Sequence, residues 1–155
     1  MRLIILALAA LLWGCAPDAP DATAPAPTAA PVATGPIVSD AWIRQVPPAA
    51  RMTAAYLRVH NPGTDPLVIV GAESPLFNSI EMHSTVMTDG VARMRRQDTV
   101  TIEPGETVDF QPGGLHFMLM QPINNIPSSG TLELSLVLDD GERVAFNAPV
   151  IQPGN

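Results

Sequence analysis

Imidazole and thioether side chains gather in the middle of this chain. Two of its three histidines, His83 and His116, lie between residues 82 and 120, together with every methionine except the initiator and Met52. A single His-x-Met triplet arises easily by chance, so this clustering is more informative than any one pair.

The downstream part of the cluster has the alternation of a β-strand. Residues 115–120 read Leu-His-Phe-Met-Leu-Met and follow a Gly-Gly pair. Because successive side chains of a strand point to opposite faces, His116, Met118 and Met120 share one face, and the apolar residues between them point towards a core. Two methionines beside a histidine on one face are typical of soft metal ligands.

The upstream part of the cluster contains His83 and, beyond a turn, Met94. Asp89-Gly90 between them is a strong hairpin signal. If residues 79–83 and 92–96 approach one another across this turn, His83 and Met94 converge.

Imidazole and thioether together favour Cu(I), a soft ion that accepts trigonal or tetrahedral coordination. Thioether is a poor ligand for Mg²⁺ and Ca²⁺, and zinc sites use cysteine, histidine and carboxylate. Methionine also suits an oxidising compartment, because its sulfur forms no disulfide. A blue-copper electron-transfer site requires a cysteine thiolate, and the only cysteine, Cys15, lies near the N-terminus.

The spacing is His83, ten residues, Met94, twenty-one residues, His116, one residue and Met118. With the surrounding segments, such as Pro-Gly-Gly-Leu-His-Phe-Met-Leu-Met at 112–120, it resembles the PCuAC-type periplasmic copper chaperones over about residues 37–150. This resemblance implies a cupredoxin-like β-sandwich of the Greek-key type and Cu(I) binding by these four residues, here called the four predicted ligands.

The resemblance also implies a recipient for the copper: the copper-accepting subunit of a respiratory cytochrome oxidase, or a thioredoxin-like copper chaperone. Two other functions stay open. One is a lipoprotein that buffers copper or confers resistance without a dedicated recipient, and the other is a structural β-sandwich lipoprotein with no metal.

The remaining methionines and the third histidine have less defined roles. We expect Met82, Met87 and Met120 to pack around the cluster, with Met82 turned away from it and Met120 at its rim. Met52 and His60 stand apart from the cluster and are interpreted as structural.

The elements around the cluster are short apolar runs separated by Pro, Gly, Asn and Asp. This pattern, with seventeen prolines and no helical periodicity, predicts an all-β sandwich. Trp42 and Tyr56 are expected in its core. The strands are expected at 53–59, 66–70, 79–83, 92–96, 99–102, 107–110, 115–120, 131–138 and 143–146.

The N-terminus is typical of an exported lipoprotein. Met1-Arg2 precedes an apolar run at 3–13 that is too short to span a bilayer. Leu12-Trp13-Gly14-Cys15 resembles a lipobox, which implies that Cys15 is lipidated.

The expected organisation has three parts. Residues 1–14 form a signal peptide, 15–36 form the lipidated cysteine and an Ala/Pro-rich tether, and 37–155 form the copper-binding domain. The protein is then periplasmic, with a lipid anchor as its sole membrane contact, and we expect a monomer.

Charge and composition exclude other functions. A net charge of −7 argues against nucleic-acid binding. Glu81 and Asp89 lie near the cluster, but the sequence offers no nucleophile–base pair, so we expect no enzyme. Arg93, Arg95 and Arg96 form a basic cluster that is either a solvated strand face or a docking patch for an acidic partner.

Overall fold

A computed structural model describes residues 35–152. The predicted signal peptide, Cys15 and most of the tether lie outside the described residues. Within this range all regular structure is β, in ten strands. They are β1 (Ile37–Arg44), β2 (Met52–His60), β3 (Leu67–Glu73), β4 (Phe77–Thr88), β5 (Val91–Gln97), β6 (Val100–Ile102), β7 (Thr107–Phe110), β8 (Leu115–Pro122), β9 (Thr131–Leu138) and β10 (Arg143–Ile151).

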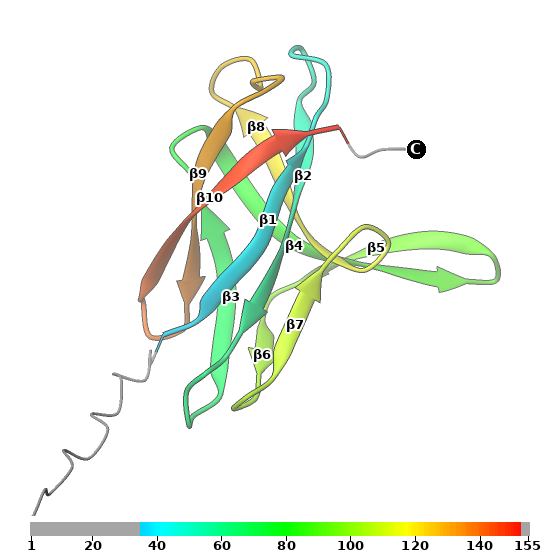
Figure 1. Cartoon of the computed structure of the whole chain (residues 1–155). Coiled ribbons are helices and arrows are strands. Elements are labelled where there is room, and N and C mark those ends of the chain that lie inside the picture. The colour runs from blue at the N-terminus through cyan, green and yellow to red at the C-terminus, as the bar shows by residue number, and fades with distance from the viewer. Residues whose placement is uncertain (1–34, 153–155) are drawn as a thin grey trace, which may run out of the picture. The chain divides into compact units, whose positions relative to one another are not determined.

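The strands form one hydrogen-bonded order, β5-β4-β8-β7-β2-β1-β10-β9-β3-β6, with an additional pairing of β8 with β2. Strand β10 joins the two halves of this order. Its last residues, Val150 and Ile151, pair in parallel with β1, whereas its earlier residues pair antiparallel with β9. The order therefore folds into two layers, one from β5 to β1 and one from β10 to β6 (Figure 1). This is the all-β sandwich that the sequence predicted.

The core lies between the two layers and follows from strand alternation. On β9 the side chains of Leu132, Leu134, Leu136 and Leu138 are buried, and the residues between them are more exposed. The facing layer contributes buried side chains from β2 and β8, including Phe117, which is fully buried. Apolar burial of this kind is the main stabilising contribution to such a sandwich.

One hairpin leaves the sandwich. Figure 1 shows β4 and β5 continuing past the layers as a projecting arm, here called the β4–β5 arm (residues 84–95). Its tip is Asp89-Gly90, with φ values of 51° and 76°. Two central residues with positive φ are the mark of a type I′ turn, for which Asp-Gly is a favoured pair. The arm is exposed to solvent; its residue Met94, for example, is 64% exposed.

The expected strands are present, and the structure extends several of them. Strand β4 continues to Thr88 and β10 continues to Ile151. No helix among residues 35–152 is long and apolar enough to cross a membrane.

Candidate metal centre

The pairing of β4 with β8 brings the two histidines together. His83 lies directly opposite His116, and Glu81 lies opposite Met118. Residues in facing positions share a face of the sheet. That face is the outer one, because Met82, which alternates with His83, points into the core and is 2% exposed.

The pairing of β4 with β5 adds the fourth predicted ligand. Met94 lies opposite Thr85, two residues along β4 from His83 and on the same face. It is thus a diagonal neighbour of His83, a position that long side chains bridge over about 7–8 Å. The structure therefore brings all four predicted ligands onto one face, with His83 at their centre.

The imidazole rings of this group are close and well enclosed. The ring centres of His83 and His116 are 6.0 Å apart. His116 is 4% exposed, and the side chain of His83 is 18% exposed. Met94 is 64% exposed. The imidazoles of the cluster are therefore shielded from solvent, whereas the thioether of Met94 is accessible to it.

Aromatic side chains cover His116. The rings of Tyr56 and His116 have centres 6.3 Å apart, and Trp42 packs on Tyr56 at 4.4 Å. We expected Trp42 and Tyr56 in the core. Tyr56 is buried as expected, at 6% exposure, whereas Trp42 is only half-buried. Their strand neighbours Ile43 and Ala55 are fully buried between the layers, so alternation turns the rings of Trp42 and Tyr56 to the side of the sheet on which His116 lies.

The polar contacts of the two histidines differ. His116 Nδ1 is 3.0 Å from the carbonyl oxygen of Gly114, to which it donates a hydrogen bond. His83 Nε2 faces a carboxylate oxygen of Glu81 at 3.5 Å. The other oxygen of Glu81 accepts from Arg96 Nη1 at 3.2 Å.

Sequence reasoning gave no role to the contacts of Glu81 and Arg96. A signal was present: Glu81 lies two residues before His83, and residues two apart on a strand share a face.

Two further methionines extend the thioether face. Met120 lies opposite Met52 across β8 and β2, on the same face as Met118. Met52 therefore lies beside Met120 although it is distant from the cluster along the chain, because β2 runs beside β8; its structural role stays a prediction. Met82 points into the core, as predicted.

The donor set decides which metals fit. Among residues 35–152, no group of three or more His, Cys, Asp or Glu side chains is placed to hold a metal ion. A zinc or calcium site built from such ligands is therefore absent from this part of the chain. Two imidazoles with nearby thioethers instead form a soft set that fits Cu(I).

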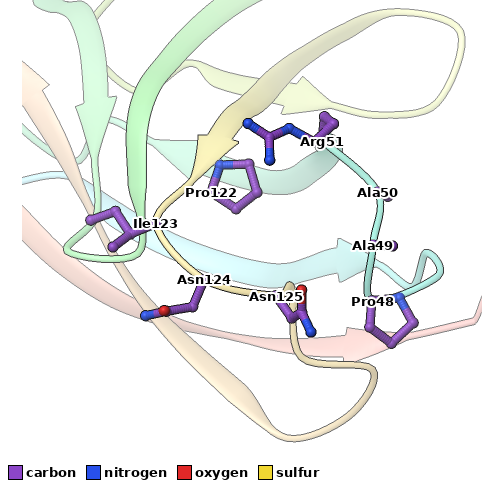
Figure 2. A pocket seen from close by; sticks show the side chains of 8 residues that line it. All are labelled: Pro48, Ala49, Ala50, Arg51, Pro122, Ile123, Asn124 and Asn125. Atoms are coloured by element: carbon purple, nitrogen blue, oxygen red, sulfur yellow. The ribbon is translucent and has the colours of Figure 1, made fainter.

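An open pocket lies elsewhere. It is lined by the β1–β2 and β8–β9 connections, and Arg51 is the single charged side chain among the residues drawn (Figure 2). Pro122 in its wall is six residues along β8 from His116, or about 20 Å on an extended strand. The pocket is therefore separate from the histidine pair.

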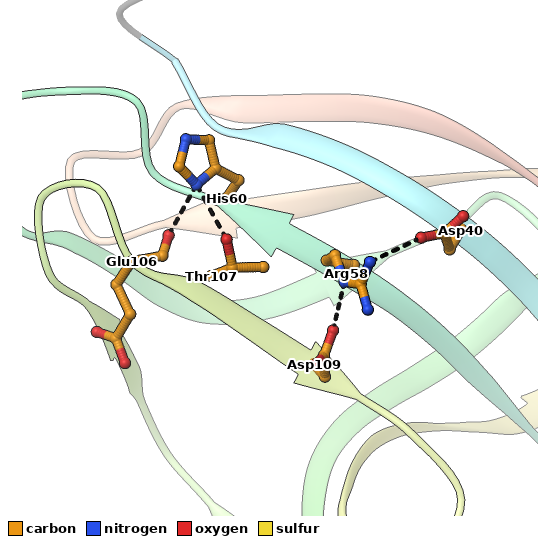
Figure 3. Close-up of polar contacts among 6 residues, drawn as sticks. All are labelled: Asp40, Arg58, His60, Glu106, Thr107 and Asp109. Carbon is orange, nitrogen blue, oxygen red and sulfur yellow. Dashed lines mark hydrogen bonds and ion pairs between the residues drawn. The ribbon is translucent and has the colours of Figure 1, made fainter.

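The third histidine is also separate. His60 Nδ1 is 3.0 Å from Thr107 Oγ1 and 3.1 Å from the backbone carbonyl oxygen of Glu106 (Figure 3). Nearby, Arg58 bridges Asp109 at 2.6 Å and Asp40 at 3.4 Å. The Asp109 carboxylate raises the pKa of the Arg58 guanidinium above its usual value. The contacts of Arg58 join β1, β2 and β7. Those of His60 join β2 to the start of β7, as expected of a structural residue.

Comparison with known proteins identifies a matching family and related sequences. The LpqE-like family, described as "Putative lipoprotein LpqE-like", matches residues 37–150. The protein named "Putative lipoprotein Lxx21020" from Leifsonia xyli subsp. xyli (strain CTCB07) is 33% identical over 140 residues, which are 90% of this chain and 81% of the relative.

Solved structures share the fold. Apo-DR1885 from Deinococcus radiodurans is 30% identical with a TM-score of 0.59, and the alignment covers 94% of this chain and 97% of that one. The CuI-DR1885 structure is 31% identical with a TM-score of 0.58, over 81% and 82% of the two chains. The copper-bound PCuAC domain from PmoF2 has a TM-score of 0.64 at 24% identity, over 78% and 97%. The sandwich is thus the cupredoxin-like fold of PCuAC domains, as predicted.

Proposed function

The chain belongs to the LpqE-like family, and we propose that it carries Cu(I) outside the cytoplasm and passes the ion to a second protein. Its sequence is 31% identical to that of DR1885, whose structure was solved with Cu(I). The ion is cargo in this proposal and is bound and released unchanged.

The four predicted ligands hold the ion in this proposal. The observation that carries the proposal is the strand register, which sets His83 opposite His116 and places Met118 and Met94 diagonally on either side of His83. Imidazole nitrogen and thioether sulfur are the donors that Cu(I) prefers. Residues far apart in the sequence thus supply one soft set on one face.

Release follows from the exposure of Met94. The two imidazoles are enclosed, whereas Met94 lies on the exposed β4–β5 arm. A ligand from a recipient can approach on this side and replace the Met94 sulfur, and the remaining ligands then leave in turn. The ion passes between proteins without entering solution.

The location and recipient belong to the same proposal. Lipidation of Cys15 anchors the protein on the periplasmic side of a membrane, and the tether gives the domain reach. The recipient is the copper centre of a respiratory oxidase or a thioredoxin-like copper chaperone. The family description and the Leifsonia relative, both lipoproteins by name, support the anchor.

Anaerobic Cu(I) titration of the purified protein against a chromophoric chelator tests the site. We expect one tight equivalent, which is lost when the four predicted ligands are all replaced by alanine. No chelator competition by the parent protein would favour the structural lipoprotein, and equal competition by both proteins would show that other residues bind the ion.

Transfer is tested separately with the loaded protein. It is mixed with an apo oxidase copper-centre domain, and copper is measured in both after separation. We expect the ion to move to the recipient. Retention by the carrier would favour a copper buffer.

A further inference from the structure

We propose that Glu81 and Arg96 are positioning residues that select the copper-binding nitrogen of His83: His83 binds through Nδ1, and His116 binds through Nε2. This inference rests on the proposed function and specifies the atoms of its site.

His83 has one nitrogen with a charged neighbour and one with none. Its Nδ1 is buried, with no hydrogen-bond partner. Its Nε2 faces the Glu81 carboxylate at 3.5 Å. An ionised carboxylate only accepts hydrogen bonds, so the neutral ring next to it carries its proton on Nε2. The lone pair then lies on Nδ1, the atom that lacks a partner.

A buried nitrogen lone pair without a partner is uncommon in folded proteins, because burial removes its contact with water. A bound metal ion supplies the missing partner. His83 Nδ1 therefore has the two properties expected of a ligand atom: an available lone pair and no competing hydrogen bond.

Arg96 fixes the carboxylate that acts on His83. It lies directly opposite His83 on β5, and its Nη1 donates to Glu81 Oε1 at 3.2 Å. Its Nε is 3.5 Å from Asp98 Oδ1. With Oε1 engaged, Oε2 of Glu81 remains for His83. Carboxylates that orient ligating histidines in this way are common around metal sites.

His116 has the opposite arrangement. Its Nδ1 donates to the Gly114 carbonyl at 3.0 Å, so its lone pair lies on Nε2. With metal–nitrogen bonds of about 2 Å, two imidazoles that share one ion have ring centres about 5–6.5 Å apart. The observed separation of 6.0 Å between His83 and His116 lies in this range.

Long-range ¹H–¹⁵N NMR of the histidines in the ¹⁵N-labelled protein tests the assignment, with and without one equivalent of Cu(I) under anaerobic conditions. Before copper is added, we expect His83 to carry its proton on Nε2 and His116 on Nδ1. On addition, the large shifts should fall on His83 Nδ1 and His116 Nε2.

The outcomes distinguish this inference from the proposed function as a Cu(I) carrier. Copper binding with the large shift on His83 Nε2 would overturn the inference and leave the carrier intact. Absence of any copper binding would overturn both.

Glu81→Gln tests the positioning role, with Glu133→Gln on the outer side of β9 as the matched control. We expect Glu81→Gln to give a mixture of His83 tautomers and a Cu(I) affinity about 10- to 100-fold weaker, with thermal unfolding like that of the control. Arg96→Gln should act in the same direction. An unchanged tautomer and affinity in Glu81→Gln would show that Glu81 does not position His83.

Discussion

At the scale of single residues, neighbours on β4 have opposite roles. Met82 is in the core and His83 is on the outer face, although they are adjacent in the chain. Met82→Ala leaves a cavity, and we expect a loss of about 2–5 kcal/mol in the free energy of unfolding. Chemical denaturation measures this loss, and Cu(I) titration of the folded variant should show unchanged affinity. Loss of copper binding in a folded Met82→Ala protein would place Met82 in the site.

Met94 should behave in the reverse way. Met94→Leu removes a thioether from an exposed position, so we expect stability within about 0.5 kcal/mol of the parent and a clearly weaker Cu(I) affinity in chelator competition. Met87→Leu is the matched control, because Met87 is also on the arm and is 65% exposed. Equal losses in both variants would contradict a specific role for Met94.

Residue patterns predicted some positions and missed others for a physical reason. Alternation within one strand predicted that Met82 and His83 point apart, because that depends on neighbours along the chain. The placement of Tyr56 over His116 depends on which strands lie side by side. Tyr56 is large and apolar enough for a core, and no local pattern distinguishes a core from a covered outer face.

At the scale of elements, the β4–β5 arm depends on its turn. Gly90 has a φ of 76°, and an added Cβ would meet nothing within 4 Å. Gly90→Ala therefore strains only the backbone, by about 1–2 kcal/mol. We expect faster amide hydrogen exchange along residues 84–95, unchanged exchange in β9, and weaker Cu(I) binding, because Met94 loses its fixed place. Uniform exchange changes across the sandwich would show that the arm is not an independent element.

The strand runs other than β1 and the Asp89-Gly90 hairpin were predictable, because both are local signals. The order of strands was not. His83 and His116 are direct partners although 33 positions separate them, 116 minus 83. Alternation indicates which side chains share a face of one strand, but not which strand lies next to it. The resemblance to PCuAC proteins supplied the predicted ligand set without its geometry.

At the scale of the whole molecule, the anchor and the metal site are separable predictions. Cys15→Ser removes the thiol that lipidation requires. We expect the protein to move from the membrane fraction to the soluble periplasmic fraction, with no lipid in its mass spectrum. Its Cu(I) affinity should be unchanged, because the four predicted ligands all lie in the sandwich and its arm. Continued membrane association of Cys15→Ser would show that another part of the chain holds it there.

The exposure of Met94 leaves its sulfur open to peroxide and hypochlorite. These oxidants reach the open Met94 sulfur more readily than the buried sulfur of Met82, which is 2% exposed. A sulfoxide at position 94 replaces a soft donor with a polar group and leaves the core untouched. If Met94 binds the ion as proposed, we expect oxidation to release copper before it unfolds the protein. Because methionine sulfoxide reductases reverse the change, we expect reduction to restore copper binding.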